Sequence, residues 1–233
     1  MSRANNKAGF TLIELMLSMA FVSILLLAIA MTVMEMSSIF NKGLTLKEVN
    51  QVGRSITSEM QSTIAATLPF DIKAGPSSRY ISQDWGGRLC VGQYSYIWNY
   101  GKAISAGDIT RLNVYSDSSN VIRFVKVIDP NAGYCTDTTK KIVNADAVEL
   151  LNASEHDLSI HSLLVSTSDS AIDHKTEQQL YNIEFTVGTN NQEALVNESG
   201  VWRCKAPGQV GADLPYCSLS SFNIVALAGN SVE

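Results

Sequence analysis

The chain contains little proline, and its longest hydrophobic run contains no charge. Only five of its 233 residues are proline, and none of them lies between Met1 and Leu68. Because an internal proline kinks or breaks an α-helix, this absence leaves the region free to form one uninterrupted helix. No charged residue occurs from Leu15 to Met34, a run made mostly of Leu, Ile, Met, Ala and Val. About twenty apolar residues in helical form are enough to cross the roughly 30 Å hydrocarbon core of a bilayer.

The sequence also lacks the short motifs that mark common catalytic sites. It has no G-x-S-x-G nucleophile elbow, no Walker phosphate loop and no G-x-G-x-x-G dinucleotide motif. Its four cysteines show no C-x-x-C spacing, which argues against a zinc site. We therefore expect a protein that is not an enzyme and that has no cofactor.

Basic residues are in the minority. The chain has 17 Lys and Arg against 22 Asp and Glu, a formal net charge of −5. Affinity for nucleic acid comes mainly from Lys and Arg that neutralise phosphates. We therefore expect no nucleic-acid partner.

One acidic residue, Glu14, stands at the start of the hydrophobic run, where an unpaired carboxylate is costly. A short polar leader, Met1 to Gly9, precedes it and carries Arg3 and Lys7. A leader, a glycine, a hydrophobic helix and one glutamate are together typical of a subunit that is processed and then polymerises through its helix.

The segment Gly9-Phe10-Thr11-Leu12-Ile13-Glu14-Leu15 resembles the prepilin cleavage and methylation motif of type IV pilins and type II secretion pseudopilins. The resemblance implies that a membrane aspartyl peptidase cuts between Gly9 and Phe10 and methylates the new N-terminus. It also implies a single-pass membrane protein with a cytoplasmic N-terminus. Its partners would be prepilin peptidase, an inner-membrane assembly platform and other pilin subunits in an extracellular or periplasmic fibre.

Three simpler interpretations compete for the same segment. A secretory signal peptide also has a basic start and an apolar core, and Ala28-Ile29-Ala30 is an A-x-A-like cleavage site. An uncleaved anchor with its positive end inside is the second, and a buried core helix is the third. Glu14 favours the prepilin interpretation, because a polymerising helix has a use for a carboxylate at that position.

The pattern predicts that the helix continues beyond the membrane run. Apolar residues recur at steps of three and four from Val49 through Ile56 and Met60 to Ile64, which places them on one face. Leu68-Pro69 ends the helix, because the residue before a proline is pushed out of the α region. We expect one helix from Phe10 to Ala66.

Strand-like segments follow Pro69, separated by turns rich in Gly, Pro, Asn and Asp. They cover residues 79–83, 88–92, 93–98, 110–115, 121–128, 158–166, 180–188 and 222–227. Residues 145–153 are expected to form a short helix. One long helix before antiparallel strands predicts an α+β protein with the helix packed on the sheet, which is also the architecture of pilins. The predicted organisation is a leader at 1–9, a transmembrane helix at 10–34, an amphipathic continuation at 35–68 and an extracytoplasmic head at 69–233.

The cysteines lie in the predicted head. An even number of cysteines on the exported side indicates two disulfides. Three pairings are possible, and the sequence favours Cys90 with Cys135 and Cys204 with Cys217, since each joins near neighbours along the chain.

Other candidate site residues are weaker. His156 and His161 lie close together in the sequence, and Glu155 and Asp157 flank His156, which suggests a metal site; exposed histidines on a loop and a strand edge are the expected explanation. Oxygens from Ser166 to Ser170 and from Asp173 suggest calcium, without the Asp-x-Asp-x-Asp-Gly loop that such a site commonly uses. The aromatic side chains of Tyr94, Tyr96, Trp98 and Tyr100 share one face of a strand and are expected in the core, with an exposed binding patch as the alternative.

The sequence therefore favours a minor pilin, a low-copy subunit of a type IV pilus or related fibre. A pseudopilin of a type II secretion system, and a fibre-borne adhesin or other binding subunit, remain the alternatives. A pilus, a secretion system and a DNA-uptake apparatus all remain open as the machine it serves.

Overall fold

The computed structural model describes residues 11–73, 75, 77–107, 109–117, 120–151, 157–167 and 178–229. By its internal contacts the chain divides into two units, Met1–Asn41 and Lys42–Glu233. The first secondary-structure element, α1, runs from Leu12 to Ala65 over 54 residues. Its bounds agree with the helix expected from Phe10 to Ala66, except that Thr11 and Ala66 lie just outside it; Phe10 is not among the described residues.

In the first unit, the described part of the chain is a bare helix. Every residue from Thr11 to Ser37 is exposed, including large apolar side chains such as Leu12, Phe21 and Leu27. Among the described residues, α1 is the one helix long and apolar enough to cross a membrane by length and composition. Nothing within this unit buries that apolar surface.

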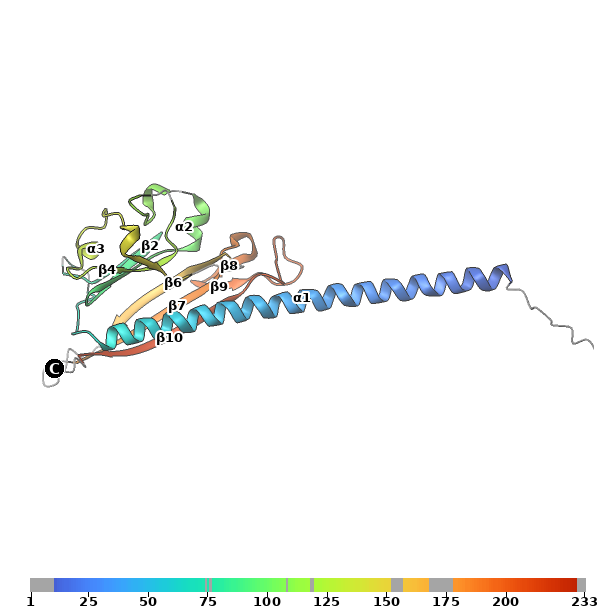
Figure 1. The fold of residues 1–233 in the computed structure, drawn as a ribbon, viewed down its shortest axis with the longest axis horizontal. Helices are drawn as coiled ribbons and strands as arrows, with labels where there is room; N and C mark the ends of the chain where they lie inside the picture. Colours follow the sequence, from blue (N-terminus) through green and yellow to red (C-terminus); the bar gives the residue numbers. More distant parts are fainter. Residues whose placement is uncertain are drawn as a thin grey trace, which may run out of the picture. The chain divides into compact units, whose positions relative to one another are not determined.

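In the second unit, the C-terminal part of α1 packs on the sheets by one narrow stripe. The side chains of Val49, Ile56, Met60 and Ile64 are at most 1 % exposed. They are the residues whose three- and four-residue spacing predicted such a stripe. In Figure 1 this part of α1 lies along strands β7 and β10. The burial of the stripe fixes which face of α1 meets the sheets.

The described strands form a five-stranded sheet, a three-stranded sheet and a separate hairpin, and all the pairings between these strands are antiparallel. The first sheet has the order β1 (Tyr80–Gln83), β2 (Gly86–Val91), β3 (Tyr94–Asn99), β4 (Phe124–Ile128), β5 (Ala147–Glu149). The second has the order β10 (Leu219–Ala228), β7 (Gln179–Thr189), β6 (Leu158–Thr167), and the hairpin pairs β8 (Leu195–Glu198) with β9 (Val201–Cys204). Two short helices, α2 (Gly101–Ala106) and α3 (Gly133–Thr136), and three 3₁₀ turns, Ile109–Arg111, Asn144–Asp146 and Gln192–Ala194, complete the described elements. The α+β fold class expected from the sequence is confirmed.

The main core lies between α1 and the two larger sheets. Tyr96 and Trp98 on β3 are fully buried in it, as expected for aromatic residues on one face of a strand. The Tyr96 hydroxyl donates a hydrogen bond of 2.8 Å to Oγ1 of Thr63 on α1. Lys126 on β4 forms a salt bridge with Glu59 on α1, and its Nζ lies 3.8 Å from the ring centroid of Tyr94. These contacts join α1 to the five-stranded sheet.

The strand expected at residues 110–115 is wrong. The structure has a 3₁₀ turn at Ile109–Arg111, followed by single bridges at Val114 and Tyr115. The reason is that side chains take the place of a neighbouring strand. The backbone N–H of Asn113 donates to Oδ1 of Asn99, and Nδ2 of Asn99 donates to the carbonyl oxygen of Asn113, both at 2.9 Å.

The short helix expected at residues 145–153 is also wrong. The chain there forms a 3₁₀ turn, Asn144–Asp146, and then strand β5, which pairs with β4. The carboxylate of Glu149 accepts hydrogen bonds from the backbone N–H groups of Phe124 and Arg123. Pairing with an open sheet edge outweighs the local helix preference of this stretch.

Candidate functional site

The helix start carries the residue that the sequence marked for assembly. Oε2 of Glu14 accepts hydrogen bonds from the backbone N–H of Thr11, at 3.0 Å, and from its hydroxyl, at 2.8 Å. The backbone N–H of Glu14 points to Oγ1 of Thr11 at 3.4 Å. This is a capping box, in which a Thr and a Glu three residues later satisfy each other's free groups at a helix start. The sequence analysis did not recognise this second role of Glu14, although the T-x-x-E spacing signals it.

Gly9 and Phe10, where cleavage and methylation are expected, lie outside the described residues. The described chain begins directly after them, at Thr11. There the start of α1 is capped and is followed by exposed apolar side chains. An exposed apolar helix in water would be unfavourable at about 25 cal/mol per Å². The segment therefore needs a bilayer or other helices around it.

Both disulfides favoured by the sequence are present. Cys90 on β2 bonds to Cys135 on α3, and Cys204 on β9 bonds to Cys217 ahead of β10. The first bond ties α3 and its loop to the five-stranded sheet. The second ties the β8–β9 hairpin to the start of β10. The described residues include no free cysteine.

Arg88 on β2 is a buried cation that the sequence analysis missed. Its guanidinium donates to Oδ1 of Asn113 and to the backbone oxygens of Tyr134, Asp137 and Lys140. Burial lowers its pKa, while the nearby carboxylate of Asp137 acts in the opposite direction. Because these acceptors lie in the segments before and after β4, Arg88 holds both segments against the sheet. Its role is structural.

His161 on β6 differs from the exposed residue that the sequence predicted. It is only 5 % exposed, so that expectation is wrong for this histidine. It stands at a β-bulge, because the pairing with β7 skips from Ile160 to Ser162. A bulge inserts one extra residue and re-aims its side chain. Nothing in a single sequence marks the position of such a bulge.

The two ring nitrogens of His161 have different surroundings. Nε2 lies 3.1 Å from the carbonyl oxygen of Thr189 and 3.3 Å from Oγ of Ser159. Nδ1 is buried without a hydrogen-bond partner among the described residues. Burial lowers the pKa of His161 to about 4, so the ring is neutral near pH 7. A carbonyl oxygen can only accept, so the single proton belongs on Nε2 and Nδ1 is a free acceptor.

His161 lines an open cavity of about 410 Å³ within the second unit. The other walls come from the β1–β2 turn, from the start of α2, from β6 and from the β8–β9 hairpin. We call this the His161 cavity, and its lining residues are Ser82, Gln83, Asp84, Tyr100, Lys102, His161, Ser162, Leu163, Leu164, Gly200 and Trp202.

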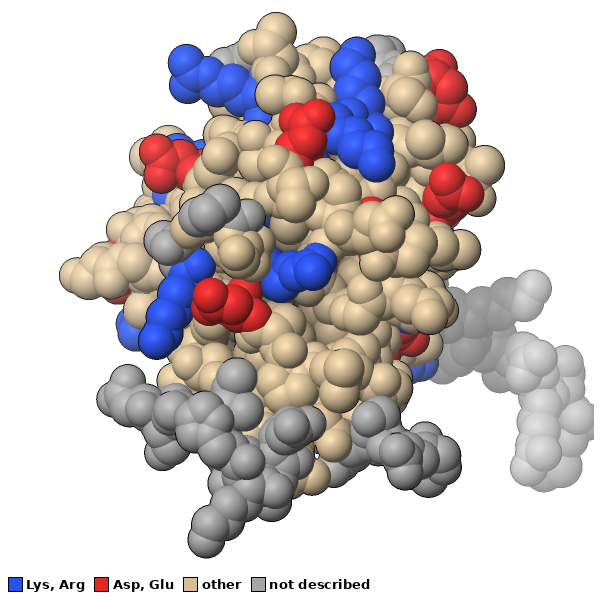
Figure 2. Space-filling view, turned by 90° about the vertical axis from the view of Figure 1, so that its left-hand side faces the viewer, with Lys and Arg blue, Asp and Glu red and all other residues tan. Residues whose placement is uncertain are grey.

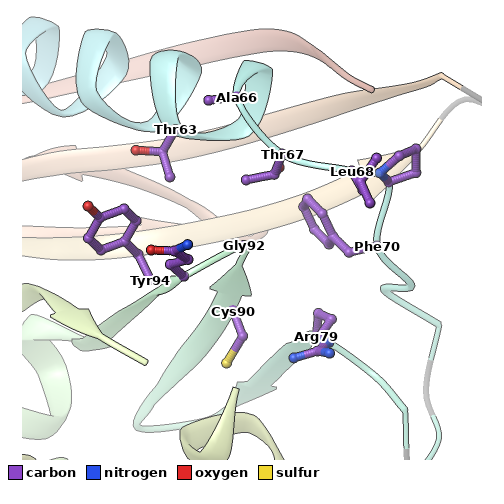
Figure 3. A pocket seen from close by; sticks show the side chains of 11 residues that line it. Thr63, Ala66, Thr67, Leu68, Phe70, Arg79, Cys90, Gly92 and Tyr94 are labelled. Atoms are coloured by element: carbon purple, nitrogen blue, oxygen red, sulfur yellow. The ribbon is translucent and has the colours of Figure 1, made fainter. Parts of the chain in front are cut away.

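A second cavity, of about 470 Å³, lies at the C-terminal end of α1 (Figure 3). Thr63 faces it from α1, while Ala66, Leu68 and Phe70 approach from the segment that follows. Gly92 from the β2–β3 turn and Tyr94 at the start of β3 lie opposite them. Its lining is mainly apolar, with Arg79 at one side.

The described residues contain no cluster of three His, Cys, Asp or Glu side chains that could hold a metal ion, and most residues of the metal sites considered from the sequence are not among them. His156 and Glu155 lie outside the described residues, as do Ser168 to Ser170 and Asp173 of the suggested calcium site. On the face shown in Figure 2, Lys and Arg side chains are interspersed with Asp and Glu.

Residues 4–34 match a family model described as the prokaryotic N-terminal methylation motif. The match covers residues 4–9 of the leader, Glu14 and the hydrophobic run, and it supports the type IV pilin and pseudopilin superfamily. Together with the apolar helix, it supports a membrane-anchored, fibre-associated protein that prepilin peptidase processes. The motif points to a structural subunit that assembles with other pilins. No curated protein and no solved structure matches the chain.

Proposed function

We propose that this protein is a minor pilin, a structural subunit of a type IV pilus or related fibre. The observation that carries the proposal is the exposed apolar helix that lies within the matched methylation motif and has Glu14 in its first turn. Such a helix can be extracted from the membrane into a fibre, where helices of neighbouring subunits bury its apolar surface. The β-rich head, with its two disulfides, would lie outside the helical core of the fibre.

In this proposal the chain has four working parts. Residues 1–9 are a leader that prepilin peptidase removes, and Phe10 becomes the methylated N-terminus. Residues 10–34 span the membrane and later form the fibre core. Residues 35–68 continue the helix into the head, and residues 69–233 form the head itself.

Glu14 would guide assembly through its charge. Cleavage creates an α-amino group on Phe10 at the membrane edge, and both this amine and the carboxylate of Glu14 are costly there when unpaired. A salt bridge from Phe10 of one subunit to Glu14 of its neighbour removes both costs and sets the register of the helices. The capping hydrogen bonds from Thr11 use Oε2 of Glu14, so the second oxygen is left for this partner.

Two variants separate the charge of Glu14 from its capping role. Glu14→Gln keeps an oxygen that accepts from Thr11 but carries no charge, whereas Glu14→Ala loses both. We expect both variants to be cleaved after Gly9 and to fold, and both to be absent from fibres, because removing one partner of a buried ion pair costs about 3–5 kcal/mol. Immunoblots of sheared fibres and of membranes, in the host or in a reconstituted pilus system, measure the distribution.

Ser18→Ala is the matched control, since Ser18 lies one turn further along α1 and its hydroxyl donates to the backbone oxygen of Leu15. It should enter fibres normally. Normal amounts of Glu14→Gln in the fibre fraction, with Glu14→Ala absent, would show that capping rather than charge is what assembly needs. Normal amounts of both would remove Glu14 from the assembly mechanism.

A further inference from the structure

One further cavity of the head gathers basic side chains. It measures about 480 Å³, and small-molecule sites commonly measure about 300–1,000 Å³. Four of its twelve lining residues are Lys or Arg, against 17 among the 233 residues of the chain. None of the lining residues that the structure describes is Asp or Glu. We call it the basic cavity, and its lining residues are Trp85, Arg88, Ile109, Thr110, Arg111, Leu112, Asn113, Val114, Thr138, Thr139, Lys140 and Lys141.

The fold brings these cations together from distant parts of the sequence. One belongs to β2, one ends the 3₁₀ turn Ile109–Arg111, and two follow α3. The backbone N–H of Ile142 donates to the carbonyl oxygen of Val114 at 3.1 Å, and Tyr115 and Ile142 form a parallel bridge. The segment after the 3₁₀ turn therefore lies beside the segment that carries the two lysines. Like charges repel, so tertiary contacts hold this cluster together against its own repulsion.

The buried cation of the cluster, Arg88, forms no ion pair with a described residue. It is 3 % exposed, and its guanidinium donates to Oδ1 of Asn113 and to three backbone oxygens. These bonds are structural, but neutral oxygens do not compensate its charge, and an uncompensated buried charge is costly. An anion in the cavity would compensate it without touching the guanidinium, because the Coulomb interaction acts over several ångströms and is stronger where water is excluded.

The two lysines of the cluster are placed to contact a ligand. Lys140 and Lys141 are both exposed. Nζ of Lys140 lies 4.4 Å from the ring centroid of Tyr134, and Cζ of Arg88 lies 5.9 Å from the same centroid. One aromatic ring thus lies close to an exposed cation and a buried one, which keeps both charges at the same wall of the cavity.

Two carboxylates act on Arg88 from outside the lining, those of Asp137 and Asp129. Both are already hydrogen-bonded within the head. Oδ1 of Asp137 accepts from the backbone N–H and the hydroxyl of Thr139, at 2.9 and 2.6 Å. Oδ2 of Asp129 accepts from the hydroxyl of Ser95 at 2.7 Å. Two carboxylates against four cations leave positive charge in excess around the cavity.

We propose that the basic cavity binds the phosphate group of a small phosphate ester. A phosphate monoester carries a charge of about −1.5 to −2 at pH 7, which matches the excess of positive charge. The two lysines and Arg111 can donate charge-assisted hydrogen bonds to its oxygens. Trp85, which is half-buried, and Ile109, which is exposed, give an apolar wall for the organic part of the ester. This site belongs to the head and stands independently of assembly through α1.

The test uses the full chain in a nonionic maltoside detergent, because a phosphocholine headgroup would compete for the site. Phenyl phosphate and glycerol 3-phosphate are titrated by isothermal calorimetry at constant ionic strength. Inorganic phosphate measures what the phosphate group contributes alone, sodium acetate serves as a simple anion, and glycerol serves as the uncharged polyol. At least one ester should bind saturably and more tightly than inorganic phosphate. Its affinity should fall as NaCl is added, because salt screens the interaction.

A pair of double variants locates the site. Lys140→Gln together with Lys141→Gln should weaken binding of the ester by about tenfold to a hundredfold, the effect of losing charge-assisted hydrogen bonds. Lys73→Gln together with Lys102→Gln removes the same charge from two lysines of the head that do not line the cavity, and should leave the affinity nearly unchanged. All four side chains are exposed, so both variants should fold, which circular dichroism and thermal unfolding check.

Each contrary outcome overturns the proposal. Without saturable binding of either ester, the cavity has no such ligand. An equal response to acetate would mean that the cavity only attracts counterions, and inorganic phosphate that binds as tightly as both esters would remove the organic part from recognition. Equal weakening by the two double variants would show that the net charge of the head, rather than this cavity, determines binding.

Discussion

Gly53 of α1 lies directly against the ring of Phe222 on β10. A Cβ built on Gly53 would come within 2.1 Å of Cε2 of Phe222. Moving the ring aside would disturb its stacking on Phe185, whose ring centroid lies 5.2 Å away. A glycine inside a helix costs about 1 kcal/mol relative to alanine. At Gly53 that cost is offset by the close approach of α1 to the three-stranded sheet.

Replacing this glycine should therefore destabilise the head. We expect Gly53→Ala to lower the free energy of unfolding by about 1–3 kcal/mol, the usual effect of overpacking a core. Denaturant unfolding of the full chain in detergent, followed by circular dichroism, measures it. Phe222→Leu in the same chain should recover part of the loss.

Gly43 provides the matched control on the same helix. A Cβ built there meets nothing within 4 Å. Gly43→Ala should be neutral or stabilise by up to about 1 kcal/mol, since only helix propensity changes. An equal loss of unfolding free energy in Gly53→Ala and Gly43→Ala would show that the contact with Phe222 is not the reason a glycine is needed at position 53.

The burial of His161 should make the stability of the head depend on pH. Its pKa is lowered from 6.5 to about 4 in the folded chain. Above pH 6.5 both states are neutral and the group contributes no pH dependence. As the pH falls below 6.5, the unfolded state binds a proton that the folded state excludes, so stability decreases until about pH 4.

Between pH 7 and pH 5 this linkage should remove about 2 kcal/mol from the free energy of unfolding. His161→Phe has no titrating group at this position. Its free energy of unfolding should therefore fall by about 2 kcal/mol less than that of the unaltered chain between pH 7 and pH 5. Denaturant midpoints at the two pH values, measured for both chains, give the difference. The same slope in both chains would mean that His161 titrates normally.

The two disulfides should form in the exported protein and leave no free thiol. Peptide mapping under non-reducing conditions should recover Cys90 with Cys135 and Cys204 with Cys217. Replacing both Cys204 and Cys217 by serine should lower the free energy of unfolding by about 2–4 kcal/mol. This is the stabilisation that the chain-entropy model gives for a disulfide that closes a loop of this size. A peptide linking Cys90 to Cys204 would contradict this arrangement.

Processing should yield a mature chain that begins at Phe10 with a methylated amine. Gly9 is expected to be essential, because a Cβ there would keep the peptidase from the backbone. Intact-mass measurement on protein from its native host determines the N-terminus, and Gly9→Ala should leave the leader attached. A mature chain that begins at Met31 would instead identify the segment as a secretory signal peptide.

Features that depend only on neighbouring residues could be predicted from the sequence. The length of the apolar run and the spacing from Val49 to Ile64 are written in consecutive positions, and both follow from helix geometry. The same holds for most strands, whose alternation needs no knowledge of their partners. The favoured disulfides joined cysteines close along the chain, and the structure has them.

Tertiary structure decided what depends on distant partners. Residues 147–149 form a strand because they pair with the edge of β4. Asn113 does not lie in the expected strand, because its backbone N–H and carbonyl groups are hydrogen-bonded to the side chain of Asn99. His161 is buried because a bulge turns it beneath Trp202, a residue 41 positions later. The physical reason is the same in each case. A hydrogen-bonding or packing partner far along the chain outweighs a local preference of a few tenths of a kcal/mol per residue, and that partner is fixed only when the chain has folded.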